Sequence, residues 1–339
     1  MSKHRAAEVA HGIGRTTDGP AGGYPRTNGV PMKVAMVKVA GNGPTTPAIV
    51  TGGGFVSLEE LLRDHEDAQL AMSFLISYFH ELRPEIEDVV QSARPLPPEH
   101  VTLLAPVPRP TNMLCCIGNY WEHADRPARP LYMYMKNPDA VVDPGGKIVL
   151  PESTEPWMFM HEAELGIVIK GPVKDVPRHD WRRAVFGFTG IVDVSARGHG
   201  RRTWGQVSWM GKSFDTFAPI GPWISTADEI PDPQDLHVRF WNDGELRHDY
   251  STEDMEHGVA EIVELASSVM TLQSGDLIAC GTNHEGLGAV QDGEKLDFEI
   301  ERIGRMSLSV SDPLGRSWER GVYLGADSTN AAVVKGGAR

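Results

Sequence analysis

The first part of the chain alternates apolar and polar positions in a way that predicts a small mixed unit. Two short β-branched runs, Lys33–Val39 and Thr46–Val50, are typical of strands. Two segments with helical spacing follow, over residues 57–65 and 67–91. We expect the second helix to break at Pro84, because proline cannot donate the backbone hydrogen bond that a helix needs.

Beyond a proline-rich connector around Pro106, Pro108 and Pro110, short β-like runs alternate with Gly, Pro, Asn and Asp turns. One helix, from Val259 to about Leu272, and one hairpin turn, Asn242–Glu245, stand out among these runs. The predicted strands are Asn112–Ile117, Leu131–Met135, Lys147–Leu150, Ala163–Ile169, Val185–Val194, Trp223–Ser225, Leu236–Trp241, Leu277–Cys280, Lys295–Ile300 and Met306–Val310.

These patterns predict an α+β chain that is rich in β-structure and has two domains. We expect a flexible arm over residues 1–31 and a frayed tail over 327–339, because both segments are composed mainly of small and polar residues. A small N-terminal domain would occupy residues 32–105, and a β-rich catalytic domain would occupy residues 110–326.

Composition and charge narrow the function classes. Hydrophobic residues make up 40% of the 339 residues, enough for a buried core, and the formal net charge of −14 argues against nucleic-acid partners. The chain has three cysteines, an odd number, and two of them are adjacent, so we expect no disulfide framework. No signal-peptide pattern and no apolar run long enough to span a membrane occurs, so we expect a cytoplasmic protein without a membrane partner.

The stretch from His161 to Ile169 carries the first candidate chemistry. Glu162 and Glu164 stand two residues apart at the head of a β-branched apolar run, so on a strand both carboxylates point to the same face. Burying two like charges side by side is costly, and a hard divalent cation with oxygen ligands would relieve that cost. Taken alone, the pair is better explained as two solvated glutamates at a strand end.

Four further segments concentrate polar chemistry: Gly118–His123, Asp193–Arg197, Lys212–Asp215 and the glycine-rich loop Gly281–Gly288. Each has an ordinary explanation on its own, as a turn, a solvated surface or a hairpin. In this order, together with Glu162–Ile169, they resemble the fumarylacetoacetate hydrolase family. Its motifs are G-x-N-Y-x-x-H, E-x-E-L-x-x-V-I, D-x-S/T-A-R, K-S-F-D and G-T-P-x-G-V-G.

The resemblance, which runs from about Cys115 to Val310, implies a mixed β-sandwich roll with a small N-terminal domain, assembled as a homodimer. It also implies site residues. Glu162, Glu164 and Asp193 would bind one Mg²⁺ or Mn²⁺, with Ca²⁺ also possible. Lys212 would lie near the oxo or enolate oxygen of a small-molecule oxo-acid substrate, and His123 would activate water. Residues that would contact the substrate are Tyr120, Arg197 and Thr282.

The chain departs from the family pattern at the acid–base residues. Many hydrolytic members place a glutamate two or three residues after the histidine, where this chain has Asp125 and Arg126. Asp125 could replace that glutamate, whereas an arginine cannot accept a proton. The loop after Thr282 is one residue longer than usual, and we expect its His284 and Glu285 to supply an alternative acid–base pair.

Three functions follow from this reading. The first is a metal-dependent hydrolase that cleaves a carbon–carbon bond in an acylpyruvate-type diketo acid through an enolate, in the catabolism of an aromatic or sugar acid. The second is an isomerase or decarboxylase of a 2-hydroxy-dienedioate or an oxaloacetate-like acid, which needs the enolate but no activated water. The third is a catalytically quiet dimer that binds a metal and an oxo acid.

Overall fold

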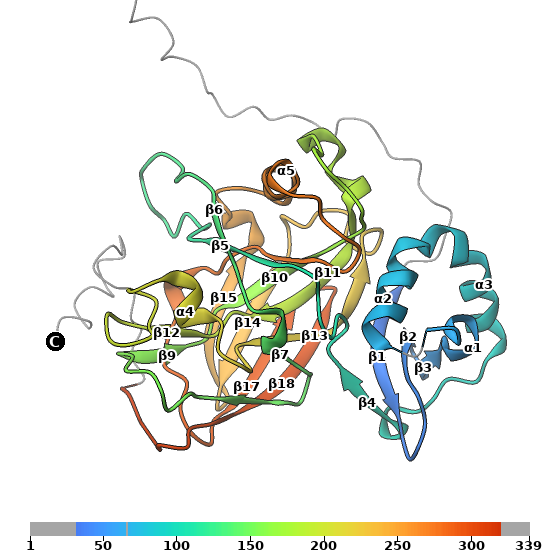
Figure 1. Ribbon diagram of the computed structural model, residues 1–339, viewed down its shortest axis with the longest axis horizontal. Helices are drawn as coiled ribbons and strands as arrows, with labels where there is room; N and C mark the ends of the chain where they lie inside the picture. The colour runs from blue at the N-terminus through green and yellow to red at the C-terminus, as the bar shows by residue number, and fades with distance from the viewer. Residues whose placement is uncertain (1–31, 66, 320–339) are drawn as a thin grey trace, which may run out of the picture. The chain divides into compact units, whose positions relative to one another are not determined.

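The computed structural model describes residues 32–65 and 67–319, and within these ranges strands predominate (Figure 1). The α+β, β-rich class predicted from the sequence is confirmed. The predicted arm over residues 1–31 and tail over 327–339 lie outside the described residues. None of the described helices is both long and apolar enough to cross a membrane.

The larger of two main sheets contains 11 strands. In spatial order it consists of β3 (Gly54–Ser57), β2 (Thr45–Thr51), β1 (Lys33–Val39), β13 (Ala218–Thr226), β11 (Val185–Val192), β10 (Ala163–Ile169), β16 (Leu277–Ala279), β5 (Met113–Ile117) and β6 (Tyr132–Met135), while β4 (Val101–Leu104) pairs with β1 and β7 (Val141–Val142) pairs with β13.

The second sheet contains five strands, and two short strands form a separate pair. The five strands are β15 (Glu245–Ser251), β14 (His237–Asn242), β17 (Lys295–Ile300), β18 (Gly304–Ser311) and β8 (Lys147–Val149), and the pair is β12 (Ser195–Arg197) with β9 (Met158–Met160).

The helices are short and lie mostly near the N-terminus or on connections between strands. They are α1 (Glu59–Leu62), α2 (Ala68–Ser77), α3 (Phe79–Ser92), α4 (Ser208–Lys212) and α5 (Val259–Val269), with 3₁₀ segments η1 (Pro98–His100), η2 (Pro138–Ala140), η3 (Arg178–Ala184), η4 (Thr252–Asp254) and η5 (His284–Gly286).

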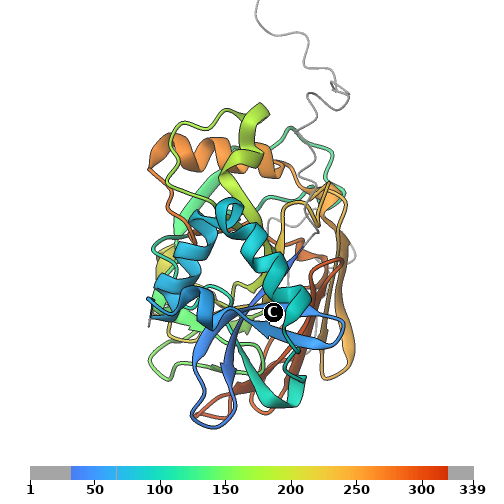
Figure 2. The same ribbon diagram turned by 90° about the vertical axis from the view of Figure 1, so that its right-hand side faces the viewer.

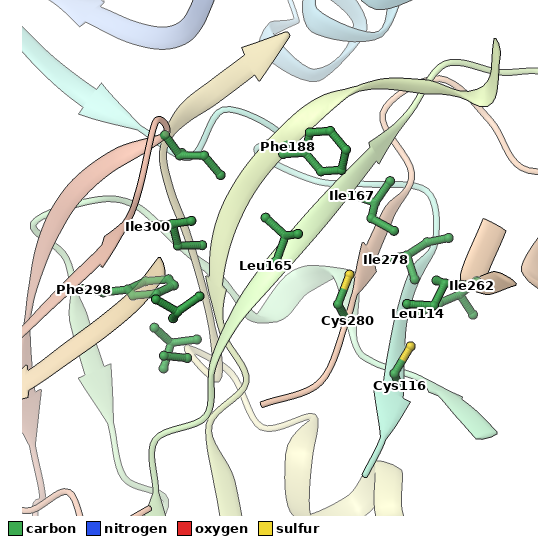
Figure 3. Packing of buried hydrophobic residues seen from close by; sticks show 14 of the residues in the cluster. Leu114, Cys116, Leu165, Ile167, Phe188, Ile262, Ile278, Cys280, Phe298 and Ile300 are labelled. Atoms are coloured by element: carbon green, nitrogen blue, oxygen red, sulfur yellow. The ribbon is translucent and has the colours of Figure 1, made fainter. Parts of the chain in front are cut away.

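The main core fills the space between the two sheets. Leu165 and Ile167 of β10 and Phe188 of β11 pack in one cluster with Phe298 and Ile300 of β17, as Figure 3 shows. Burying such side chains stabilises the fold by about 1.5–3 kcal/mol each. Every residue of β10 is buried because both faces of this strand are covered, which explains the continuous apolar run from Leu165 to Ile169 after Glu164.

The N-terminal strands are part of the larger sheet rather than a separate one. β1 pairs antiparallel with β13, Val34 opposite Ile224, and both residues belong to a second core cluster. Helix α2, which packs on β2, and its neighbour α3 also contribute to that cluster (Figures 1 and 2). Strands from both sides of the predicted boundary at residues 105–110 therefore share one sheet. The division into two domains stays a prediction.

Most predicted elements appear where the apolar pattern placed them. The strands Ala163–Ile169 and Lys295–Ile300 match to the residue, and the hairpin turn Asn242–Glu245 joins β14 to β15. The predicted break at Pro84 is wrong, because the helix is interrupted at Tyr78 and Pro84 lies inside α3. The carbonyl that loses its partner there belongs to His80, an exposed residue at the start of α3.

Candidate metal and oxo-acid site

The two glutamates lie at the start of β10, opposite the end of β11. In this antiparallel pair Glu164 faces Ile191, and the backbone N–H of Asp193 donates to the carbonyl oxygen of Glu162 at 2.7 Å. Residues two apart on a strand share a face, so the three acidic side chains project to the same side. One carboxylate oxygen from each lies within 4.8 Å of the other two, and all three side chains are buried.

Three cationic side chains surround these carboxylates. Lys212, the last residue of α4, donates from Nζ to Glu162 Oε2 and to Asp193 Oδ2, each at 2.6 Å. Lys136 Nζ donates to Asp193 Oδ1 at 2.7 Å, and Arg197 Nη2 donates to Glu162 Oε1 at 2.8 Å. The buried cluster therefore carries equal numbers of positive and negative groups, which lowers the cost of removing them from water.

The glutamates respond to these neighbours in opposite ways. Burial disfavours the charged form of Glu162, but Lys212 and Arg197 outweigh that effect and hold its pKa below the usual value. The pKa of Glu164 is raised well above its usual value by burial and by the negative charges of Asp193 and Glu162. The positive charge is thus unevenly shared, and Glu164 is the least compensated carboxylate of the three.

One carboxylate oxygen of Glu164 lacks a hydrogen-bond donor in the described part of the chain. Glu164 Oε2 accepts the backbone N–H of Gly281 at 2.7 Å, whereas the buried Oε1 has no hydrogen-bond partner among the described residues. A buried carboxylate oxygen without a donor is costly, and divalent cations such as Mg²⁺ and Mn²⁺ prefer such oxygens. The donor set therefore fits a hard divalent cation, which would compete with Lys212 for Glu162 and Asp193.

Two residues that contact Asp193 were not singled out from the sequence. Tyr134 Oη donates to Asp193 Oδ2 at 2.5 Å, and Lys136 also donates to the backbone carbonyl of Lys212. Tyr134 lies on β6 and Lys136 directly follows that strand, so alternation places their side chains on one face. That spacing of an aromatic and a lysine is the sequence signal that could have found them, but it is common in solvated strands.

The three predicted substrate contacts take different positions. Arg197 is largely buried, and its guanidinium lies 5.1 Å from the centre of the Trp204 ring. Thr282 is buried directly after Gly281, whose N–H binds Glu164. Arg197 and Thr282 therefore belong to the surroundings of the carboxylates. Tyr120 is fully buried with its ring edge-on to Tyr250 at 5.1 Å, and burial raises its pKa well above the usual value.

The predicted acid–base residues take part in two histidine–glutamate pairs, and each pair joins the loop 118–123 to the loop 281–288. His123 Nε2 lies 3.4 Å from Glu285 Oε2, and His284 Nδ1 lies 2.5 Å from Glu122 Oε1. His284 and Glu285 therefore each contact a residue of the loop 118–123, and their role as an acid–base pair stays a prediction. Glu122 was not singled out from the sequence, because no local pattern indicates that it contacts the second loop.

Asp125, the alternative partner for His123, is an exposed residue on the segment that follows. Its neighbour Arg126 donates from Nη2 to Glu256 Oε1 at 2.6 Å, and Arg129 donates from its backbone N–H to Glu256 Oε2 at 2.6 Å. Glu256, whose side chain is completely enclosed, thus attaches the segment 124–130 to the loop that follows η4.

Comparison with known proteins agrees with this architecture. The family model for the C-terminal part of fumarylacetoacetate hydrolase matches residues 112–311. A maleylpyruvate hydrolase from Aquipseudomonas alcaligenes is 32% identical over 70% of this chain and 85% of its own length. The oxaloacetate tautomerase YisK from Bacillus subtilis is 34% identical over 62% of this chain and 73% of its own length.

Solved structures show the same fold. The maleylpyruvate hydrolase from Sphingobium sp. SYK-6, in complex with manganese(II) and pyruvate, superposes with a TM-score of 0.72 at 31% identity, over 83% of this chain and 99% of that one. A 2-hydroxyhepta-2,4-diene-1,7-dioate isomerase from Mycobacterium marinum gives 0.65 at 29% identity, over 83% and 99%. The matched region contains both strands that carry the acidic triad, and the predicted β-sandwich architecture is confirmed. This chain belongs to the fumarylacetoacetate hydrolase family.

Proposed function

We propose that this protein is a divalent-metal-dependent hydrolase that cleaves a carbon–carbon bond in an acylpyruvate-type diketo acid. The observation that carries the proposal is the convergence of three buried carboxylates with a lysine amine bonded to two of them. Relatives named as a maleylpyruvate hydrolase, one of them with manganese(II) and pyruvate in its crystal structure, support an oxo acid as the substrate.

In this proposal Glu162, Glu164 and Asp193 hold one Mg²⁺ or Mn²⁺, and the same oxygen ligands also suit Ca²⁺. Such a cation, when bound, supplies a Lewis acid that withdraws electron density from the oxygens of a 2-oxo acid. It would also leave the otherwise balanced cluster with a net positive charge, which favours an anionic ligand.

In the same proposal, the surrounding side chains bind the substrate, stabilise its charge and transfer a proton. The Lys212 ammonium stabilises negative charge that develops on the substrate's oxo oxygen, an effect typically worth several kcal/mol in a buried site. Arg197 and Thr282 contact the substrate's carboxylate, and Tyr120 shapes the pocket wall. His123, aided by Asp125 or by the His284 and Glu285 loop, removes a proton from water.

The bonds balance without a further reactant. The water oxygen bonds to carbon C4 of the diketo acid, and the C3–C4 bond breaks. Its electron pair moves onto the pyruvate fragment as an enolate, which takes up a proton at C3. The products are a carboxylic acid and pyruvate, both anions.

A second function at the same site has its own support. Isomerisation or decarboxylation of a 2-hydroxy-dienedioate or an oxaloacetate-like acid requires the enolate but no activated water. His123 is 85% exposed, a poor position for a base that must deprotonate water in an enclosed site. Relatives named as an oxaloacetate tautomerase and a hydroxydienedioate isomerase favour the same alternative.

Purified protein incubated with acetylpyruvate, and separately with oxaloacetate, tests both functions. Hydrolysis removes the enol absorbance of acetylpyruvate and releases acetate and pyruvate, only when Mg²⁺ or Mn²⁺ is present. Accelerated enol–keto conversion or CO₂ release from oxaloacetate, without acetylpyruvate cleavage, selects the second function. Metal binding with neither reaction would contradict both and leave a catalytically quiet oxo-acid binder. The homodimer remains part of the proposal and is checked by light scattering.

A further inference from the structure

Two adjacent residues of the loop 118–123 contact two adjacent residues of the loop 281–288, and the first two have an unusual backbone conformation. Glu122 and His123 both have positive φ, 52° and 58°, in consecutive left-handed positions that side chains rarely adopt. This turn directs Glu122 to His284 and His123 to Glu285. Such strain persists only where the surrounding structure enforces it, and it gathers at functional sites.

The two pairs differ in their access to water. His284 and Glu122 are 22% and 16% exposed at their side chains, whereas His123 is 85% exposed. Backbone N–H groups reinforce the inner pair, because that of His284 donates to Glu122 Oε1 at 3.0 Å and that of Glu122 donates to Asp254 Oδ2 at 3.1 Å. The inner pair is therefore held in place, while His123 of the outer pair lies largely in solvent.

The inner pair is also coupled to the carboxylate cluster. The loop that carries His284 contacts that cluster directly, because Gly281 N–H donates to Glu164 Oε2. Gly281 has a φ of 87°, and an added Cβ would lie 3.1 Å from the Cβ of Asn119, so the two loops are closely packed at this point. The pKa of Glu162 also depends on His284. Burial alone would raise this pKa, but the positive charges of Lys212, Arg197 and His284 lower it.

We propose that His284, rather than His123, is the residue that moves the substrate's proton, and that Glu122 is its positioning residue. This inference rests on the proposed function. The Glu122 carboxylate accepts a hydrogen bond from Nδ1–H, which selects the neutral tautomer with a lone pair on Nε2. Nε2 is then available as the general base, and the carboxylate stabilises the imidazolium that forms.

The proton transfer is the step that both reactions share. Nε2 takes a proton from C3 of a 2-oxo acid, and the electron pair of that C–H bond moves to the oxo oxygen as an enolate. In the reverse direction Nε2 returns the proton to C3 of an enolate, including one released by C–C cleavage. No oxidant, reductant or additional reactant is required.

The test measures proton exchange at C3 of oxaloacetate and 2-oxobutyrate in D₂O by NMR, with saturating Mn²⁺, together with steady-state turnover. We expect His284→Ala to lower kcat about 100- to 10,000-fold with KM and Mn²⁺ affinity nearly unchanged. Added imidazole should partly restore exchange in this variant, which a merely structural role would not allow. His284→Gln, which is closer in size, guards against loss of the fold.

Glu122→Gln keeps an acceptor but removes the charge, and it should lower kcat while leaving KM close to wild type. His179→Ala, an exposed histidine outside both loops, is the matched control. The inference is overturned if folded His284 variants exchange C3 protons at the wild-type rate, or if His123→Ala alone abolishes exchange. A wild-type protein that exchanges no C3 proton and turns over no oxo acid would instead overturn the proposed function.

Discussion

At the scale of single residues, the site is an electrostatic compromise between three carboxylates and three cations. Lys212 and Lys136 hold Asp193, and Lys212 and Arg197 hold Glu162, while among the described residues Glu164 accepts only a backbone N–H. Without a bound cation Glu164 is the member whose charge is least stabilised, which agrees with the direction of its pKa shift. Glu164 is therefore the carboxylate whose charged form is least favourable without a metal, and a bound metal would stabilise that charge most.

We predict that Glu164→Gln lowers Mn²⁺ affinity by more than about 100-fold, since losing a ligand costs at least as much as losing an outer-shell partner. The metal-free variant should be at least as stable as wild type, because the substitution removes a repelling charge next to Asp193 and Glu162. Titration calorimetry measures the first effect and thermal unfolding the second.

Lys212→Met is the contrasting variant for that experiment. Removing this cation should leave Mn²⁺ binding intact or tighter, because the ammonium competes with the metal for Glu162 and Asp193, while turnover is lost. Unchanged Mn²⁺ affinity in Glu164→Gln, or loss of binding in Lys212→Met, would contradict the assignment of these roles.

At the scale of elements, the segment 124–130 is held against the sandwich by one acidic side chain. Glu256 accepts hydrogen bonds from Arg126 and Arg129, and His257 Nε2 lies 2.6 Å from the carbonyl oxygen of Arg129. Burial disfavours the charge of Glu256, but the hydrogen bonds from the two arginines outweigh it, so its pKa lies below the usual glutamate value. This attachment fixes the loop that carries Glu122 and His123.

The lowered pKa of Glu256 gives this attachment a defined pH dependence. A carboxyl whose pKa is lower in the folded state contributes stability above its unfolded pKa of about 4.3 and loses it as pH falls through the folded value. We expect the amides of residues 124–129 to lose hydrogen-exchange protection as the pH falls below about 4. Exchange rates must be corrected for the intrinsic effect of pH.

In Glu256→Gln the same amides should exchange faster at pH 7 and show little further change on acidification. Glu253→Gln, at an exposed position on η4, is the matched control and should behave as wild type. Equal protection in wild type and Glu256→Gln at pH 7 would show that the segment is held by other contacts.

At the scale of the whole molecule, the described chain shares one sheet and one core across the predicted domain boundary. β1 pairs with β13, and the cluster that contains Met72 and Leu75 of α2 also contains Ile191 of β11 and Ile220 of β13. Separating these parts would expose apolar surface and unpaired backbone groups on both sides.

We therefore predict a single thermal unfolding transition in calorimetry rather than two. Mn²⁺ at about 100 times its Kd should raise the free energy of unfolding by about 2.7 kcal/mol and shift that one transition as a whole, an effect absent in Glu164→Gln. Two resolved transitions, with only the upper one responding to Mn²⁺, would establish residues 32–105 as an independent domain.

Local spacing and motif order were enough to predict the carboxylates and the lysine that converge in the structure. The alternation along β10 placed Glu162 and Glu164 on one face, and the motif order pointed to Asp193 and Lys212 as their partners. These inferences held because they depend on local spacing and on residue types whose burial is costly without compensation.

The neighbours that complete the site are brought there by long-range packing. Lys136 reaches Asp193 because β6 lies at the edge of the same sheet, and Glu122 meets His284 because two loops 162 positions apart are packed together. Such contacts are set by strand order and loop packing over long sequence separations, which no local pattern of apolar and polar residues records. The same long-range pairing joined β1 to β13 across a boundary that the proline-rich connector had suggested.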